Sequence, residues 1–321
     1  MKHVFKTYQS LIENTLARQD FDRDPEGLYQ PIRYILSLGG KRLRPALCLA
    51  ACDLFEGSLE NALMPALSLE VFHNFTLVHD DIMDASEYRR GKKTVHKKWD
   101  QNTAILSGDA MLIKAYQYLA KADKKLVPAL LEVFSKTALE ICEGQQLDVD
   151  FEQQAATSEE DYLEMIRLKT AVLLGCALKM GAILAKAPKK SQQELYEFGI
   201  LAGMAFQVQD DLLDLSEDQV KVGKTEGGDI LNDKQTLLSI YAREANAKGW
   251  HDLQAQNLQG GAKVKAWKQF FERSGSIAKT KEKRDTLLDD ALSHLKKVSA
   301  QNAALKADLA QYTTWLAHRE Y

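Results

Sequence analysis

Residues Glu60–Asp84 read ENALMPALSLEVFHNFTLVHDDIMD, and this stretch decides the fold class. Its apolar residues recur at helical spacing, which predicts one long buried helix from about Asn61 to Asp84. Pro65 is tolerated there because proline disrupts a helix least near its start. The helix ends in a cluster of aspartates, so an apolar core element leads directly into charge.

Helical spacing dominates the rest of the chain as well. Only six prolines and eighteen glycines occur in 321 residues, few for so long a chain. Ser158 and Asp161 form a predicted capping box. We expect a polar functional loop at 216–236 and a further loop at 257–267, and we find no linker, repeat or strong strand pattern. The sequence thus predicts one all-α domain over residues 1–321, with helices at 102–122, 127–149, 158–184, 192–215 and, as the last and most polar, from about 279.

Composition and charge exclude several classes of protein. The net charge of −3 argues against a general nucleic-acid binder. The four cysteines form no CxxC pair, and Cys48 and Cys52 are predicted to be small core residues of a reduced, cytoplasmic protein. The amphipathic N-terminus lacks the apolar centre of a signal peptide, and no apolar run is long enough to span a membrane.

Two copies of one acidic pattern follow apolar helices. The first places Asp80, Asp81 and Asp84 in DDIMD, and the second places Asp210, Asp211 and Asp214 in DDLLD. The outer aspartates of each motif share one helix face, so each motif can present two carboxylates in one direction. Magnesium is usually held by a few carboxylates together with substrate phosphate. A single DDxxD is commonly a solvated helix end, but two such copies favour a metal site.

Basic residues accompany these acids in four short segments. GGKRLRP supplies Lys41, Arg42 and Arg44, and RRGKK supplies Arg89, Arg90, Lys92 and Lys93. RLKTA supplies Lys169 and Thr170, and VGKTEGGDILNDK supplies Lys224 and Lys234. Arginine suits phosphate, and the neighbouring glycines let backbone approach a ligand closely. The combination predicts a site for metal and diphosphate.

In their order, these motifs resemble the trans-isoprenyl diphosphate synthases, which join isoprenoid diphosphates head to tail. The motifs are GGKRLRP, DDIMD with RRG after it, a GQ…D segment at Gly144–Asp148, KTA at Lys169–Ala171, FQVQDDLLD and GK…D…K. The resemblance runs from Gly39 to about Lys234 and more loosely beyond. It implies an all-α isoprenoid synthase bundle around a deep cavity, a homodimer, and two acidic motifs facing each other across the cavity mouth.

The resemblance also implies roles for individual residues. Asp80, Asp84 and Asp210 are expected to bind Mg²⁺, three ions in all with Mn²⁺ as a substitute, supported by Asp81, Asp211 and Asp214. The allylic diphosphate is assigned to Arg89, Lys169, Lys224 and Lys234. The isopentenyl diphosphate is assigned to Lys41, Arg44, His73 and Arg90. His73 has core packing as its alternative, and His96 is expected only to order its loop.

The implied reaction is ionisation, condensation and elimination, as in a prenyltransferase. The C–O bond of dimethylallyl, geranyl or farnesyl diphosphate breaks, isopentenyl diphosphate attacks the allylic cation, and a proton is lost to pyrophosphate. Thr170, Gln207 and the backbone of Lys169 are expected to stabilise that cation, and the ring of Phe206 has core packing as its alternative.

Product length is expected to depend on side chains just before Asp80. Phe75 lies five residues before Asp80 and Phe72 eight before, with the smaller Thr76 between them and the motif. In the family that the chain resembles, this pattern implies geranylgeranyl diphosphate, with farnesyl diphosphate as the alternative product. Plain core packing is the alternative reading of Phe72.

Two rival classes share part of this pattern. A class I terpene cyclase also uses DDxxD, but it needs no second diphosphate site such as GGKRLRP. A non-catalytic subunit of a heteromeric synthase usually loses aspartates or basic residues from these motifs, and none is missing in this chain.

Overall fold

The computed structural model describes residues 2–152, 154, 156–216 and 227–319. The described residues are 77% helical with almost no strands, which confirms the all-α prediction. No helix among the described residues is both long and apolar enough to cross a bilayer.

Residue contacts divide the chain into two compact units, each assembled from three separate stretches. The first unit comprises residues 1–135, 176–195 and 299–308, and the second comprises 136–175, 196–298 and 309–321. Because the chain passes repeatedly between the units, neither is a continuous segment. Four helices have residues in both units: α7 (Val127–Glu152), α9 (Val172–Leu184), α10 (Lys189–Asp214) and α16 (Ala303–Ala317).

The first unit is built around α4. Its elements are α1 (Lys2–Ala17), α2 (Glu26–Ser37), α3 (Leu43–Asp53), α4 (Leu59–Met83), β1 (Tyr88–Arg89), β2 (Lys92–Lys93), α5 (Val95–Lys98) and α6 (Gln101–Leu119). The Ser58 hydroxyl accepts the N–H of Asn61 and caps α4, and Pro65 lies inside the helix. The predicted buried helix is confirmed.

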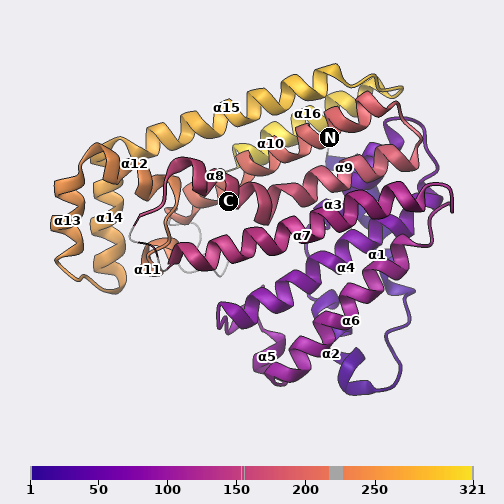
Figure 1. Cartoon of the computed structure of the whole chain (residues 1–321), viewed down its shortest axis with the longest axis horizontal. Coiled ribbons are helices and arrows are strands. Elements are labelled where there is room, and N and C mark those ends of the chain that lie inside the picture. Colours follow the sequence, from indigo (N-terminus) through magenta and orange to yellow (C-terminus); the bar gives the residue numbers. More distant parts are fainter. Residues whose placement is uncertain (1, 153, 155, 217–226, 320–321) are drawn as a thin grey trace. The chain divides into compact units, whose positions relative to one another are not determined.

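Helix α4 packs against α3 and along α6 (Figure 1). Gly108 of α6 allows this approach, because a Cβ there would lie 2.3 Å from Nε2 of His79. Cys48 and Cys52 of α3 are completely buried, as predicted, and Cys142 is the exposed thiol.

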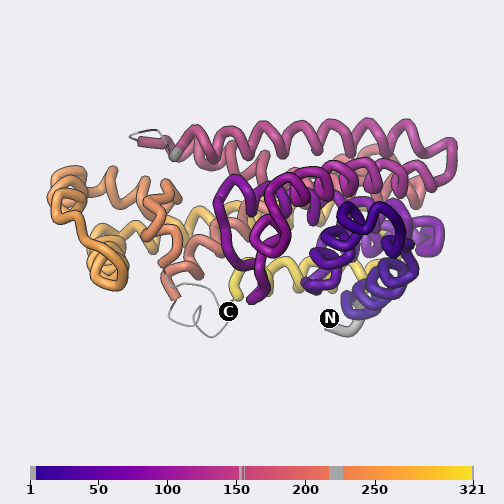
Figure 2. The backbone as a smooth tube through the Cα atoms, turned by 90° about the horizontal axis from the view of Figure 1, so that it is seen from below, coloured from indigo at the N-terminus to yellow at the C-terminus, as the bar shows by residue number. Residues whose placement is uncertain are grey.

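The second unit contains α8 (Glu159–Ile166), the π-helix η1 (Arg167–Ala171), α11 (Gly228–Leu231), α12 (Leu237–Ala245), α13 (Ala247–Gln254), α14 (Gly260–Ser274) and α15 (Ser276–Lys297). An apolar cluster that includes Leu238, Trp267, Phe270 and Phe271 joins α12 to α14. Helices α12, α13 and α14 form the orange part of the tube in Figure 2.

Several boundaries differ from the sequence prediction. The stretch 158–184 begins with the predicted Ser158 cap, whose Oγ accepts the N–H of Asp161 at 3.1 Å, but η1 interrupts it. The predicted loop at 257–267 is wrong from Gly260 onward, where α14 begins. The prediction of one last helix from about residue 279 is also wrong, because α15 ends at Lys297 and a separate helix, α16, follows. A short antiparallel hairpin, formed by the two-residue strands β1 and β2, was not predicted.

Candidate active site

The first acidic motif ends α4 and lies beside the β1–β2 hairpin. Asp81 is 1% exposed, and both of its carboxylate oxygens accept Nε–H of Arg89 at 2.9 Å. Burial raises the pKa of Asp81, although the Arg89 guanidinium opposes that rise. Asp80 is half-buried and Asp84 is exposed. The middle carboxylate is thus neutralised by the protein, while the outer pair lies nearer to solvent.

A cationic cluster surrounds His73 in the same unit. Nη1 of Arg44 lies 3.0 Å from Nε2 of His73. An arginine only donates, so this imidazole nitrogen accepts and the ring is neutral. The pKa of His73 is held well below its ordinary value by burial, then by Arg44 and three further arginines. Burial also lowers the pKa of Arg44 to about 10, and its buried Nε has no hydrogen-bond partner among the described residues. An unpartnered buried donor in a cationic cluster suits an anionic ligand.

The three basic residues of GGKRLRP lie in different environments. Arg42 is buried in a left-handed conformation and pairs at 2.7 Å with both Glu13 and Glu70, so its role is structural. Lys41 is exposed. Arg90 donates from Nη1 to the carbonyl of Gly39, and a Cβ on Gly40 would lie 2.9 Å from the same Nη1. Gly39 therefore binds the Arg90 guanidinium through its carbonyl, and Gly40 leaves the space that the guanidinium occupies.

The predicted chain-length residues belong to a row of aromatic rings. Phe72 is 1% exposed and lies 5.2 Å from the ring of Phe134, so it packs in the core. Phe75 is half-buried, and its ring lies 5.5 Å from Phe72 and 4.9 Å from His79. Thr76 donates its hydroxyl to the carbonyl of His73 at 2.8 Å. Phe75 is therefore the bulky ring next to DDIMD that is only partly buried, whereas Phe72 is fully buried.

The second acidic motif ends α10 and has other partners. Asp211, 5% exposed, accepts hydrogen bonds from the Tyr162 hydroxyl and from Nε2 of Gln207 at 3.0 Å. Burial, followed by the nearby Asp229, raises its pKa to about 8. The carboxylate of Asp214 accepts the N–H groups of Gly228 at 3.1 Å and Asp229 at 2.9 Å, and so fixes the start of α11.

The first carboxylate of that motif, Asp210, contacts the guanidinium of Arg319. The same guanidinium lies 4.1 Å from the centre of the Phe206 ring. Burial lowers the pKa of Arg319 to about 10, which leaves it cationic at neutral pH. The sequence prediction missed this residue because no local pattern connects it to Asp210.

The KTA segment lies on the π-helical turn η1. Nζ of Lys169 lies 2.5 Å from Asp148, and Nζ of Lys234 lies 4.0 Å from the same carboxylate. The Thr170 hydroxyl donates to Oε1 of Gln207 at 3.3 Å. Such π turns often occur at functional sites because they rearrange the backbone hydrogen bonds.

Two glycines allow neighbouring helices to reach this turn. A Cβ on Gly144 of α7 would lie 2.3 Å from the backbone nitrogen of Lys169. A Cβ on Gly203 of α10 would lie 2.8 Å from the Cα of Ala171. A larger residue at either position would displace η1, and with it the side chains of Lys169 and Thr170.

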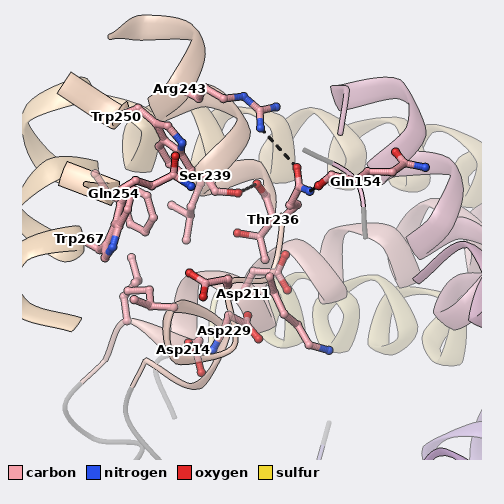
Figure 3. Close-up of a pocket in the computed structure, with 17 residues that line it drawn as sticks. Gln154, Asp211, Asp214, Asp229, Thr236, Ser239, Arg243, Trp250, Gln254 and Trp267 are labelled. Atoms are coloured by element: carbon pink, nitrogen blue, oxygen red, sulfur yellow. Dashed lines mark hydrogen bonds between the residues drawn. The ribbon is translucent and has the colours of Figure 1, made fainter. Parts of the chain in front are cut away.

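Two pockets border these groups in the second unit. A pocket of about 130 Å³ is lined by predicted residues, among them Lys169, Thr170, Gln207 and Lys234. A larger pocket of about 240 Å³ has Asp211, Asp214 and Asp229 on one side and Trp250 and Trp267 on another (Figure 3). The structure therefore gathers most predicted site residues of this unit around connected concave surfaces.

Some residues of the site were not predicted from the sequence. For two predicted residues, Lys224 and His96, the structure adds little information about their roles. Tyr162 was missed because a tyrosine in an amphipathic helix carries no distinguishing signal. Asp229 lies within the predicted GK…D…K segment, but the sequence prediction gave it no role of its own. Lys224 lies outside the described residues. Burial and Lys97 lower the pKa of His96, and the negative charge of Asp81 opposes that change. Its buried Nδ1 has no partner within the described part of the chain.

Comparison with known proteins identifies the family. A model of the polyprenyl synthetase family matches residues 25–273. The chain belongs to the polyprenyl synthetase family. A geranylgeranyl diphosphate synthase of Methanosarcina mazei is 44% identical over 70% of each chain. A geranylfarnesyl diphosphate synthase of Natronomonas pharaonis is 34% identical over 98% of this chain and 96% of the other. The crystal structure of a geranylgeranyl pyrophosphate synthase, 44% identical, covers 99% of each chain with a TM-score of 0.93.

Polyprenyl synthetases generally use a divalent metal. Within the described ranges no three metal-ligating side chains converge into a ready-made site. The available donors are nonetheless carboxylates, the hard oxygen ligands that Mg²⁺ prefers, and Mg²⁺ commonly completes its shell with water and substrate phosphate. The donors of each motif therefore fit Mg²⁺ that binds together with a diphosphate.

Proposed function

We propose that this protein is a short-chain trans-prenyltransferase that condenses isopentenyl diphosphate with allylic diphosphates and makes geranylgeranyl diphosphate. The observation that carries the proposal is that each unit has its own cationic cluster beside an acidic motif. The first unit holds Arg44 and Arg90 around His73, and the second holds Lys169 and Lys234 around Asp148. A condensation of two diphosphates needs two anion sites, whereas a cyclase needs one.

The acidic motifs hold the metal in this proposal. Asp80, Asp84 and Asp210 are the principal ligands, with Asp81, Asp211 and Asp214 in support, for three Mg²⁺ ions that Mn²⁺ can replace. When bound, the ions act as Lewis acids that withdraw charge from the leaving diphosphate. The protein's own contribution is to keep Asp81 and Asp211 fixed by hydrogen bonds so that the outer carboxylates are oriented.

Lys169, Lys234 and Arg89 bind the allylic diphosphate, together with Lys224 in the segment outside the described residues. The π turn directs Thr170 and the Lys169 backbone toward the developing cation, and Gln207 adds its carbonyl dipole. The contact between Thr170 and Gln207 supports this role because it fixes both dipoles before substrate arrives. Preorganised dipoles need no reorganisation when charge develops.

Lys41, Arg44, His73 and Arg90 bind isopentenyl diphosphate. The partnerless Nε of Arg44 and the neutral state of His73 support this assignment. A neutral imidazole accepts from Arg44 and can donate from its other nitrogen to the substrate.

Product length depends on Phe75 in this proposal. Relatives named for two different products, geranylgeranyl and geranylfarnesyl diphosphate, match the chain at 44% and 34% identity. The residues that limit the length of the growing chain are therefore a more direct criterion of product length than overall similarity. The ring of Phe75 contacts the rings of Phe72 and His79, which hold it in place. A ring held in this way would limit the length of the growing prenyl chain. The same rigidity keeps farnesyl diphosphate as the second candidate product.

We further propose a homodimer, a single catalytic domain over residues 1–321 and a cytoplasmic location. Leu106 and Ile113, one heptad apart on α6, are 59% and 58% exposed, an apolar surface that a second copy would cover. The domain proposal rests on the repeated passage of the chain between the units, and the location on the use of cysteine as free thiols.

A product assay tests the proposal. Purified protein with Mg²⁺ receives labelled isopentenyl diphosphate and dimethylallyl, geranyl or farnesyl diphosphate, and product length is read by chromatography. We expect a twenty-carbon product that lengthens with Phe75→Ala and shortens with Phe75→Trp. A fifteen-carbon product would replace geranylgeranyl by farnesyl. No elongation from any primer would overturn the synthase assignment, and a cyclic hydrocarbon would identify a cyclase.

A further inference from the structure

Arg319 occupies a carboxylate that the proposed function assigns to metal. Its guanidinium contacts Asp210, whose side chain is 32% exposed, whereas the Arg319 side chain is only 7% exposed. The cation is thus held from the protein side, and the carboxylate keeps access to solvent. A carboxylate with one accessible side is available for exchange of its partner.

The arginine is held in place by more than this ion pair. Its backbone carbonyl accepts Nε2–H of Gln209 at 2.7 Å, and Oε1 of Gln209 in turn accepts Nη1–H of Arg284 at 2.6 Å. Its guanidinium stacks on Phe206 at 4.1 Å, which gives the cation a second favourable surface besides the carboxylate. The backbone anchor and the aromatic surface do not depend on Asp210.

One donor of the same guanidinium remains unused. Nη1 of Arg319 is buried and has no hydrogen-bond partner within the described residues. A side chain with a fixed backbone, an alternative aromatic contact and an unused donor can leave Asp210 without losing its place. The arrangement differs from that of Arg42, in which each of the three guanidinium nitrogens has a hydrogen-bond partner.

We propose that Arg319 is a built-in counter-ion of Asp210, which holds this carboxylate while metal is absent and must leave it before a divalent cation binds there. The inference rests on the proposed function, because that function assigns Asp210 to metal. It predicts that metal binds the substrate-free protein weakly, since each ion at Asp210 competes with a tethered cation. Arg319 would thereby keep the second motif from loading fully before diphosphate arrives.

The test measures Mn²⁺ binding without substrate, from the free-ion signal in electron paramagnetic resonance. Arg319→Gln removes the competing charge, and we expect about fivefold tighter Mn²⁺ binding, the size of a partly buried ion pair. Arg319→Lys keeps the charge but loses the planar contact with Phe206, so about twofold tighter binding is expected. Arg273→Gln, at an exposed position of α14, removes an equal charge elsewhere and should leave the affinity unchanged.

Unchanged or weaker binding by Arg319→Gln would overturn the proposal, and so would an equal gain in Arg273→Gln. If Arg319→Gln does not fold, Arg319→Lys carries the same comparison. As a second readout, Mn²⁺ should raise the melting temperature of Arg319→Gln more than that of the unchanged protein, because ligand binding stabilises by its affinity. Absence of elongation by the unchanged protein at saturating Mg²⁺ would instead refute the proposed function, whatever the Mn²⁺ affinities are.

Discussion

In the first acidic motif a cation neutralises the middle carboxylate, Asp81, whereas in the second two neutral donors hold the equivalent Asp211. The outer positions also differ: Asp84 is exposed, while Asp214 fixes the start of α11. The same DDxxD spacing thus produces two electrostatic environments. Spacing fixes which carboxylates share a helix face, and the surrounding elements decide their charge and freedom.

The largest effect is expected where the two motifs act alike. Asp80→Asn and Asp210→Asn should each lower kcat about 1,000-fold, because each removes a carboxylate that orients the metal. Steady-state elongation assays measure this, with Asp252→Asn on exposed α13 as the control. A large loss in only one of the two variants would show that the motifs differ in function as well as in environment.

The glycines beside the two cationic clusters should separate binding from chemistry. Gly144→Ala displaces the backbone of Lys169 and should lower kcat about 100-fold, as misplacement of a catalytic group does. Gly40→Ala displaces Arg90 and should raise KM for isopentenyl diphosphate about tenfold, with a smaller change in kcat.

The control for both is Gly261→Ala, because a Cβ at Gly261 meets nothing within 4 Å. Equal changes of kcat in Gly40→Ala and Gly144→Ala would contradict the division of substrate binding between the two clusters.

Stability should distinguish the two middle carboxylates. Asp81→Asn leaves Arg89 without its counter-ion, and we expect a loss of about 2 kcal/mol after allowance for the partial exposure of Arg89. Asp211→Asn keeps an acceptor for the Tyr162 hydroxyl and should cost about 1 kcal/mol or less. Denaturant unfolding of metal-free protein measures both losses, and a larger loss for Asp211→Asn would reverse the comparison.

The smallest effect concerns pH and the cationic first unit. The pKa of His73 is depressed, so its contribution to stability is present above the unfolded pKa of about 6.5 and is lost as pH falls toward the folded value. The loss approaches about 1.4 kcal/mol per pH unit for one proton. His73→Gln should flatten the unfolding free energy between pH 7 and 5, roughly the window below that unfolded pKa.

His251→Gln on exposed α13 is the matched control for this pH dependence and should leave the slope unchanged. Equal slopes for the protein and for His73→Gln would show that His73 is not held neutral by its surroundings.

Much of the fold followed from periodicity, because long helices with apolar faces carry a strong signal. The signal failed at breaks that depend on packing. The turn η1 occurs where Gly144 and Gly203 let two other helices approach closely. The break between α15 and α16 contains no proline that would mark it in the sequence. Motif spacing likewise brought together Lys169, Thr170 and Gln207. It could not find Tyr162 or Arg319, whose roles come from tertiary contacts with Asp211 and Asp210.

The position of Asp148 between Lys169 and Lys234 has a consequence for selectivity. Both lysines already have an anionic partner, so a ligand gains from them only by offering more negative charge than one carboxylate. A prenyl alcohol offers none and would leave both lysines on Asp148. A diphosphate exceeds that threshold, and a monophosphate does so by a smaller margin. The site would therefore sort ligands by the charge of the head group before the length of the tail matters.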